Sequence, residues 1–430
     1  MSPERLNVAV FGAGPAGLSS AMEIANAGHN VEVITPETSR LPHSVYTTDR
    51  FVSPESVQTF FRPESTRKLP IIRIITSNGT DFKIHLGPNN ARYFMVDYPS
   101  TLDRVQKELS ERRDIHFSPA PMEVLNSVQI EDHKSGVTVL LDGQKNHFDL
   151  VVDATGVGGK VDETINPNHE ENFLAEYVYG GTFRGNFQDD EIILIFGPAG
   201  GTSWANPSIE GNGFVDVVFS AWGPKRNFSE FLREARTRLD QLVGFLSGKP
   251  GIEIQSIVPE YVYSGLIRSQ PTRVPSTQNV YAVGEAAGMA KPTSGDSIRR
   301  AIIAGRLLAE SVKKGESPRQ FHHRWRKTWK SDNFYLAGAL ARLSYQKRGK
   351  IGGTMDQTGI MLRESNTEDA DKFVSQFEEY ITDGKLNLGL LARLLSSKMF
   401  VLGLTATAIK QLELKFREPV LPKTLPLPEI

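Results

Sequence analysis

Near the start of the chain the spacing of hydrophobic residues changes twice, from a continuous run to a helical spacing and back to a run. Residues 7–11, NVAVF, form a short apolar run, and residues 31–35, VEVIT, form another. Between them, Leu18, Met22 and Ile24 give a helix one apolar face. Short apolar runs indicate buried strands, whereas apolar residues every three or four positions indicate an amphipathic helix. The segment is therefore predicted to be a strand, a helix and a second strand.

A hairpin and another helix are predicted next. Residues 71–87 contain two strand-like runs joined at Asn78-Gly79, a dipeptide that tolerates positive φ and favours a tight turn. A helix then follows the start signals in residues 97–100. Its apolar face is formed by Leu102, Val105 and Leu109.

The second half of the chain changes character. Residues 175–265 are rich in short strand-like runs such as EIILIF and FVDVVFSAW, which predict an antiparallel sheet. From about residue 318 the chain is predicted to be helical, with Phe321, Trp325 and Trp329 on its inner face. The final residues, REPVLPKTLPLPEI, contain prolines that exclude a regular helix.

Composition narrows the class of protein. The 430 residues are 39% hydrophobic and 23% charged with a net charge of -1, which is typical of a soluble protein and argues against nucleic acid as a partner. The absence of cysteine excludes disulfides, thiolate metal sites, iron-sulfur clusters and a cysteine nucleophile. Redox chemistry would therefore need a bound cofactor. The adjacent His322 and His323 have no evident third ligand, so no metal site is predicted.

The start of the chain and its late apolar segment bear on location. The first residues run into a strand without the apolar stretch of a secretory signal, which predicts a cytoplasmic protein. The apolar residues 386–409 are interrupted by Arg393 and Lys398 and are not expected to span a bilayer. Their apolar surface could instead lie on a membrane, although ordinary helix packing explains it better.

The turn after the first predicted strand matches G-x-G-x-x-G. It consists of Gly12, Ala13, Gly14, Pro15, Ala16 and Gly17. In this motif the first glycine permits a tight turn, the second lets a pyrophosphate approach the backbone, and the third allows the helix to pack closely on the strand. The helix N-terminus then presents unpaired amides and its positive dipole end to the phosphates. A dinucleotide site is predicted here.

The second predicted strand ends in Thr35, where a carboxylate that binds the adenosine ribose is expected. A threonine hydroxyl can still form a hydrogen bond with the ribose. Without the acid, however, a 2′-phosphate is not rejected, so this motif alone leaves NADP open beside FAD.

Two further motifs follow in chain order. A buried strand ends in Asp153-Ala154-Thr155-Gly156, and the segment NVYAVGEAAGMAKPTSGDSI places Gly284-Glu285 after another strand. A helix is predicted to open near Gly295, Asp296, Ser297 and Ile298.

With these three motifs in order, residues 7–330 resemble the FAD-dependent flavoproteins that include aromatic hydroxylases and geranylgeranyl reductases. The resemblance implies an α/β fold: a Rossmann-like, glutathione reductase-type FAD-binding domain, an antiparallel β-sheet substrate domain and a C-terminal helical region. The implied domains are residues 1–68, 94–170 and 268–330 for FAD, 69–93 and 171–267 for the substrate, 331–416 for the helical region, and 417–430 for a Pro-rich tail.

The same resemblance assigns roles to residues. The Gly12–Gly17 loop, Thr35, Asp153 and Gly156 would hold FAD, as would Gly284 and Glu285. The amides from Gly295 to Ile298 would lie at the N1 and O2 edge of the flavin. The chain departs from the family in Glu285, where aspartate is usual, and in Tyr98, where an arginine is common.

The resemblance leaves the reaction open. GPAGGTSWANP, with Trp204 and Pro207, resembles the Gly-Gly-Tyr-x-Trp-x-Phe-Pro segment of geranylgeranyl reductases, so these two residues are candidates for the wall of an apolar substrate site, although Trp204 could equally fill a core. The preferred reading is reduction of carbon-carbon double bonds in an isoprenoid or other apolar substrate by hydride from reduced flavin, with NAD(P)H, ferredoxin or a flavin reductase as external donor. The motifs name no catalytic side chain.

Two alternatives remain. The first is a monooxygenase that hydroxylates or epoxidises its substrate through a flavin C4a-hydroperoxide. The second is a degenerate flavoprotein that binds without turnover, because Thr35, Tyr98 and Glu285 all depart from the usual pattern. The chain has no Trp-x-Trp-x-Ile-Pro sequence, so a halogenase is not predicted.

Overall fold

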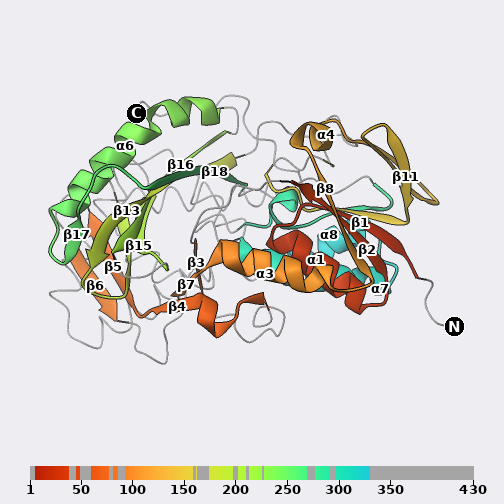
Figure 1. The fold of residues 1–430 in the computed structure, drawn as a ribbon, viewed down its shortest axis with the longest axis horizontal. Coiled ribbons are helices and arrows are strands. Elements are labelled where there is room, and N and C mark those ends of the chain that lie inside the picture. Colours follow the sequence, from red (N-terminus) through yellow and green to blue (C-terminus); the bar gives the residue numbers. More distant parts are fainter. Residues whose placement is uncertain are drawn as a thin grey trace, which may run out of the picture.

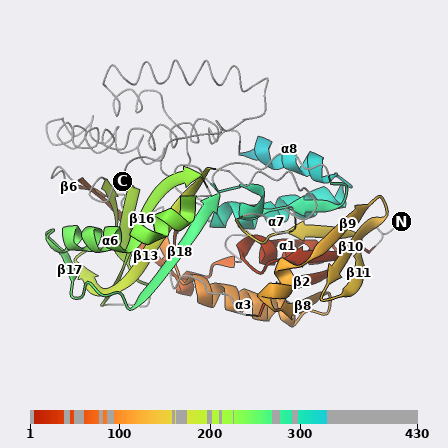
Figure 2. The same ribbon diagram turned by 90° about the horizontal axis from the view of Figure 1, so that it is seen from above.

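Two sheets with their helices make up most of the protein that the computed structural model describes (Figure 1). The described residues are 5–37, 45–48, 60–76, 81–85, 93–157, 161, 174–196, 202–209, 213–224, 227–268, 277–290 and 297–329. Figures 1 and 2 both show the two sheets side by side. The predicted C-terminal helical region and Pro-rich tail lie outside the described residues.

The first sheet has five parallel strands in the order β19-β12-β1-β2-β8. Their bounds are β1 Asn7–Phe11, β2 Asn30–Pro36, β8 Ile115–Ala120, β12 Leu150–Asp153 and β19 Val280–Ala282. Helix α1, Pro15–Asn26, joins β1 to β2, so the predicted strand, helix and strand are confirmed. Because all five strands are parallel, their carboxyl ends meet at one edge of the sheet.

The two faces of this sheet are covered differently. Val8 and Val10 of β1 pack among residues of the helices, whereas Ala9 and Phe11 pack on a small antiparallel sheet, as the alternation of side chains along a strand requires. The helices are α1, α3 Tyr98–Ser110, α7 Ile298–Lys313 and α8 Pro318–Thr328. The small sheet consists of β9 Gln129–His133, β10 Gly136–Leu141 and β11 Gln144–Phe148 and is preceded by the short helix α4, Met122–Asn126.

Both helices predicted near these strands are confirmed. Asp97 caps α3 by accepting a 3.1 Å hydrogen bond from the Ser100 amide, and the three predicted apolar residues of α3 are buried. In and just after α8, Phe321, Trp325 and Trp329 are at most 5% exposed, which confirms their inward packing. No helix among the described residues has both the length and the apolar character needed to cross a bilayer.

The second sheet has eight strands. The order is β17-β13-β16-β15-β14-β5-β6, and β18 pairs with β13. The bounds are β5 Ile71–Thr76, β6 Asp81–His85, β13 Leu174–Phe187, β14 Glu191–Phe196, β15 Thr202–Pro207, β16 Phe214–Pro224, β17 Ile252–Ile254 and β18 Tyr261–Arg268. The predicted hairpin is confirmed by the antiparallel pairing of β5 with β6, while its Asn78-Gly79 turn lies outside the described residues. All other pairs are antiparallel except β5 with β14.

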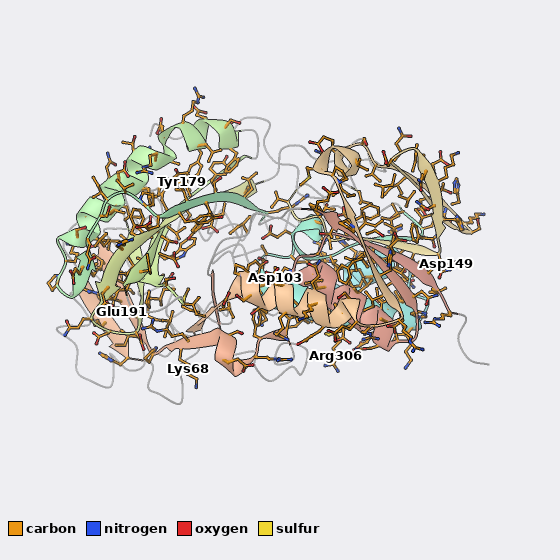
Figure 3. All side chains as sticks on the ribbon, viewed as in Figure 1. Lys68, Asp103, Asp149, Tyr179, Glu191 and Arg306 are labelled. Carbon is orange, nitrogen blue, oxygen red and sulfur yellow. The ribbon has the colours of Figure 1, made fainter. Side chains whose placement is uncertain are left out.

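The strand-rich region of residues 175–265 also contains a long helix that was not predicted. Helix α6, Phe228–Ser247, covers one face of the sheet. Its buried residues are Phe231, Ala235, Leu239, Leu242, Val243 and Leu246. Their spacing of three or four is a helical period that the surrounding short apolar runs obscured. Tyr179 lies beneath α6 (Figure 3), on the face that the helix covers.

A three-stranded antiparallel sheet adjoins these two. It has the order β3-β7-β4, with bounds β3 Val45–Thr48, β4 Thr66–Leu69 and β7 Tyr93–Val96, and the 3₁₀ helix η2, Pro63–Ser65, precedes β4.

Candidate cofactor and substrate site

The glycine loop between β1 and α1 has the geometry that its motif requires. Gly12 has φ of 101°, and a Cβ there would lie 2.5 Å from the Ala154 carbonyl oxygen. A Cβ on Gly17 would lie 1.8 Å from the Gly12 carbonyl oxygen, so only glycine lets α1 start this close to the loop. By contrast, no described atom lies within 4 Å of a Cβ built on Gly14. The second glycine therefore faces open space at the N-terminus of α1.

The second motif lies directly beside this loop. The Ala154 amide donates a 2.9 Å hydrogen bond to the Phe11 carbonyl, which joins the ends of β12 and β1. Asp153 is fully buried, and its Oδ1 accepts hydrogen bonds from the amide and the hydroxyl of Thr155, at 3.0 and 2.6 Å. Gly156 has φ of 83°, which a glycine adopts readily. The bonds of Asp153 thus shape the turn at the sheet edge.

The third motif packs on the first. The Val283 amide donates a 2.9 Å hydrogen bond to the Asp153 carbonyl, and Gly284 opens the 3₁₀ helix η4, Gly284–Ala287, with φ of 63°. A Cβ on Gly284 would lie 2.7 Å from Cβ of Ala16 in α1. The three motifs, distant in sequence, therefore meet at the carboxyl ends of β1, β12 and β19.

Glu285 in η4 connects this meeting point to α7. Ser297, the residue before α7, donates a 3.1 Å hydrogen bond to Glu285 Oε1. Although some of the residue's surface is exposed, desolvation of the carboxyl raises the pKa of Glu285 to about 7, and the bond from Ser297 opposes the shift. Tyr98, at the start of α3, is close enough to interact electrostatically with Glu285: burial first and Glu285 second raise the pKa of its hydroxyl well above the usual range. Ile298 begins α7.

The structure brings together most of the predicted cofactor residues. Thr35 is 6% exposed near the end of β2, at the same sheet edge, where its neighbour Ile34 accepts a 2.8 Å hydrogen bond from the Gly12 amide. Its contact with a ribose stays a prediction. The predicted residues Gly295 and Asp296 lie outside the described part of the chain.

Trp204 belongs to the other sheet, in the middle of β15. Its neighbour Ala205 packs in the cluster beneath α6, and successive side chains point to opposite faces, so Trp204 lies on the face turned away from α6. It is partly buried and is paired with Leu194 and Val218. Pro207 ends the strand and is buried.

A tyrosine shares this face. Tyr263 of β18 is paired with Gly180 of β13, and Gly180 is paired with Val218, so Tyr263 and Trp204 stand in one row across the sheet. A Cβ on Gly180 would lie 2.7 Å from Cζ of Tyr263, so the missing side chain makes room for the phenol ring. Burial first, and then Asp216, raise the pKa of Tyr263.

One residue on this face was not predicted. Glu176 of β13 is 4% exposed, and burial raises its pKa to about 7, while a hydrogen bond from Ser220 opposes the shift. An isolated acid within the apolar and aromatic run LAEYVY is the signal that could have found it.

The histidines of α8 take no part in this arrangement. His322 is buried and His323 exposed, so they lie on different faces of the helix. In the described part of the chain, no group of three or more acidic or histidine side chains could hold a metal ion.

Comparison with solved structures shows the fold. A geranylgeranyl bacteriochlorophyll reductase-like protein from Thermoplasma acidophilum matches with a TM-score of 0.62 and 14% identity, over 94% of this chain and 99% of that chain. A flavin-dependent brominase also matches with a TM-score of 0.62, at 15% identity over 96% of this chain and 100% of that chain.

Sequence comparison adds relatives of somewhat higher identity. A digeranylgeranylglycerophospholipid reductase from Methanospirillum hungatei is 24% identical over 79% of this chain and 84% of its own length. A chloroplastic neoxanthin synthase from Solanum lycopersicum is 22% identical over 76% of this chain, and the match spans 66% of that protein. No protein-family model matches the sequence. The chain is thus similar in fold to a geranylgeranyl reductase-like protein and to flavin-dependent enzymes, and similar in sequence to a lipid reductase and a neoxanthin synthase.

Proposed function

We propose that the chain binds FAD and uses it to reduce carbon-carbon double bonds in an isoprenoid or other apolar substrate. The observation that supports FAD binding is the meeting of three glycine-containing turns at the carboxyl edge of the parallel sheet, with open space at Gly14. A dinucleotide fits this edge because the α1 N-terminus favours negative charge and the backbone at Gly14 is open to close approach. The five-stranded sheet, with the small sheet on its far face, would be a glutathione reductase-type domain with the boundaries predicted above.

Each part of the edge has a role toward FAD. The Gly12–Gly17 loop would hold the pyrophosphate, and the hydroxyl of Thr35 would form a hydrogen bond with the adenosine ribose. The turn from Asp153 to Gly156 would line the middle of the cofactor. Glu285 would bind near the ribityl and pyrophosphate portion, and the amides at Ser297 and Ile298, with Gly295 and Asp296 before them, would face the flavin ring.

The chemistry divides between cofactor and protein. Reduced FAD supplies hydride when an external donor has reduced it. The face that carries Trp204 and Tyr263 would hold the apolar substrate away from water, with Pro207 at its border. The geranylgeranyl lipid in the name of the archaeal relative supports this substrate class.

Oxygen-atom transfer is the second candidate. The brominase matches the structure with the same TM-score as the reductase-like protein, and a peptidyl tryptophan dihydroxylase matches with a TM-score of 0.53. The fold therefore suits a monooxygenase as well as a reductase.

Anaerobic stopped-flow absorbance separates the two. The protein is loaded with FAD, reduced with dithionite, and mixed with a geranylgeranyl glycerol ether or with oxygen. A reductase is expected to reoxidise with the lipid in the absence of oxygen and to react slowly with oxygen. Fast reaction with oxygen and no anaerobic response to the lipid would favour the monooxygenase. A protein that cannot be loaded with FAD would contradict both.

A further inference from the structure

Glu176 is buried on the substrate-facing side of the eight-stranded sheet. Its neighbour Tyr177 packs with Phe228 and Phe231 of α6, so Glu176 points to the opposite face, the one that carries Trp204. The carboxyl atom Oε2 is buried and receives no hydrogen bond from the described residues. A buried polar atom without a partner costs free energy, so its presence here calls for a ligand or a chemical role.

The position of Glu176 along the sheet brings it toward the proposed cofactor site. It is paired with Ile267, the penultimate residue of β18, and β18 lies against η4, the element that contains Glu285. Strand β18 therefore links the sheet face that bears Glu176 with the edge where the three motifs converge.

The nearest described neighbours of Glu176 on its own face are uncharged. Val178, Gly265 and Ile267 are apolar neighbours, and Ser220 donates the one hydrogen bond that bears on the acidity of the carboxyl. The titratable and charged groups described on the adjoining strands β16 and β18 and in η4 are Tyr263, Tyr261 and Asp216 further along the same face, Arg268 on the opposite face of β18, and Glu285 in η4. Burial is the main reason that Glu176 retains a proton near neutral pH.

We infer that Glu176 is a catalytic residue of the proposed reduction, the acid that protonates the substrate. This inference rests on the proposed function. When a carbon-carbon double bond is reduced, a hydride from the reduced cofactor forms one new C–H bond with its electron pair. The π electrons form the second new bond with the proton of Glu176, which is left as a carboxylate and is reprotonated from solvent. Ser220 positions the carboxyl and lowers its pKa.

The test uses the FAD-loaded protein, reduced with dithionite and mixed anaerobically with a geranylgeranyl glycerol ether. The wild-type rate of lipid-dependent reoxidation is expected to fall as the pH rises through about 7. Glu176→Gln is expected to be about 100-fold slower or more, as for loss of a general acid, and to show no such pH dependence. Glu253→Gln, the same change at an exposed position of β17, is the matched control and is expected to behave like wild type.

Ser220→Ala distinguishes proton donation by Glu176 from a merely structural role of that residue, because only proton donation makes the pH dependence of the rate respond to this change. Because the Ser220 hydrogen bond lowers the pKa of Glu176, its removal is expected to shift the fall in rate to higher pH. Infrared difference titration of the oxidised protein gives a second readout: a protonated-carboxyl band that titrates near neutral pH, is absent in Glu176→Gln and shifts when the lipid binds.

The outcomes separate the inference from the proposed function. The role of Glu176 would be overturned if Glu176→Gln kept the rate and pH dependence of wild type, or if it kept the protonated-carboxyl infrared band. The proposed reductase would remain in place. Failure of the lipid to reoxidise the wild-type protein would overturn the reductase itself, and the proton-donor role with it.

Discussion

Ser297 donates a hydrogen bond of 3.1 Å to Glu285, so the residue that precedes α7 is tied to the 3₁₀ helix after β19. Tyr98 approaches the same carboxyl from α3. Tyr98 and Glu285, two of the three residues that depart from the pattern of the flavoproteins resembled in sequence, are thus close enough to interact.

The protonation of Glu285 is expected to control FAD affinity. With its pKa near 7, the carboxyl is mostly neutral at pH 6 and mostly charged at pH 8, where it repels the anionic pyrophosphate. We expect FAD to bind about tenfold more weakly at pH 8 than at pH 6, a difference of about 1.4 kcal/mol. Fluorescence titration of the apoprotein measures this, and Glu285→Gln should remove the pH dependence. Equal dependence in wild type and variant would assign it to another group.

Gly14 is expected to serve cofactor binding and not folding. A methyl group at Gly14 meets no described atom, so Gly14→Ala should leave the melting temperature of the apoprotein within a few degrees of wild type. It should weaken FAD binding at least about tenfold, because the methyl group occupies the path of the pyrophosphate. Gly244→Ala in α6, where the added methyl is equally unobstructed, is the control and should bind FAD normally. Unchanged affinity in Gly14→Ala would place the pyrophosphate elsewhere.

His322 is expected to make the protein sensitive to acid. Burial first, then Arg326 and His323, lower its pKa to about 3, whereas an exposed histidine titrates near 6.5. Its contribution to stability is therefore complete above pH 6.5 and is lost as the pH falls toward 3, by about 2 kcal/mol at pH 5.

Urea unfolding of wild type and His322→Leu at pH 7 and pH 5 measures this loss as the difference between the two proteins. The comparison is needed because Glu176 and Glu285, whose pKa values are raised, make the folded state more stable as the pH falls over the same range. The exposed neighbour provides the control variant His323→Leu. A wild-type loss at pH 5 that persists in His322→Leu would contradict the assignment.

A buried ion pair joins the two parallel strands of the otherwise antiparallel sheet. Nη1 of Arg73 in β5 lies 3.2 Å from Oε1 of Glu191 in β14, and the two side chains are 3% and 1% exposed. Asp81, which pairs with Arg73, and Lys83, which pairs with Glu191, complete the network. Figure 3 shows Glu191 within this sheet. Arg73→Met should lower the free energy of unfolding by about 3 kcal/mol, because it removes the buried partner of Glu191 and leaves that carboxylate with only the partly exposed Lys83.

Glu191→Gln should lower the free energy of unfolding by less than Arg73→Met does, because Asp81 still accepts hydrogen bonds of 2.8 and 2.6 Å from Arg73. The control is Arg67→Met, which breaks a more exposed pair with Asp190 and should cost no more than about 1 kcal/mol. Chemical denaturation compares the three, and equal costs for Arg73→Met and Arg67→Met would show that burial of the pair is unimportant.

Local patterns predicted the elements whose signals lie in neighbouring residues. The glycine loop, the hairpin from Ile71 to His85 and the capped start of α3 at Asp97 all depend on short-range geometry. Helix α6 also had a local signal, in the spacing from Phe231 to Leu246, but adjacent strands masked it.

Other features depend on contacts that no local pattern contains. The parallel pairing of β5 with β14 joins residues more than a hundred positions apart, and the burial of Glu176 depends on how the sheet meets its surroundings. Likewise, the approach of Tyr98 to Glu285 follows from the packing of α3 and η4 on one core. A single sequence shows which residues such contacts have available but not which of them meet.

The strand order has a consequence for biosynthesis. The hairpin of β5 and β6 leaves the ribosome before three of the five parallel strands, yet among the described strands its partner is β14. Strand β19 completes the parallel sheet only after the described strands of the second sheet have emerged. Neither sheet can therefore be completed while the other is still unsynthesised. Pairings so distant in sequence close slowly and leave strand edges exposed in the nascent chain. The protein should thus fold late and as one cooperative unit, and cutting it between the sheets should give fragments that assemble only together.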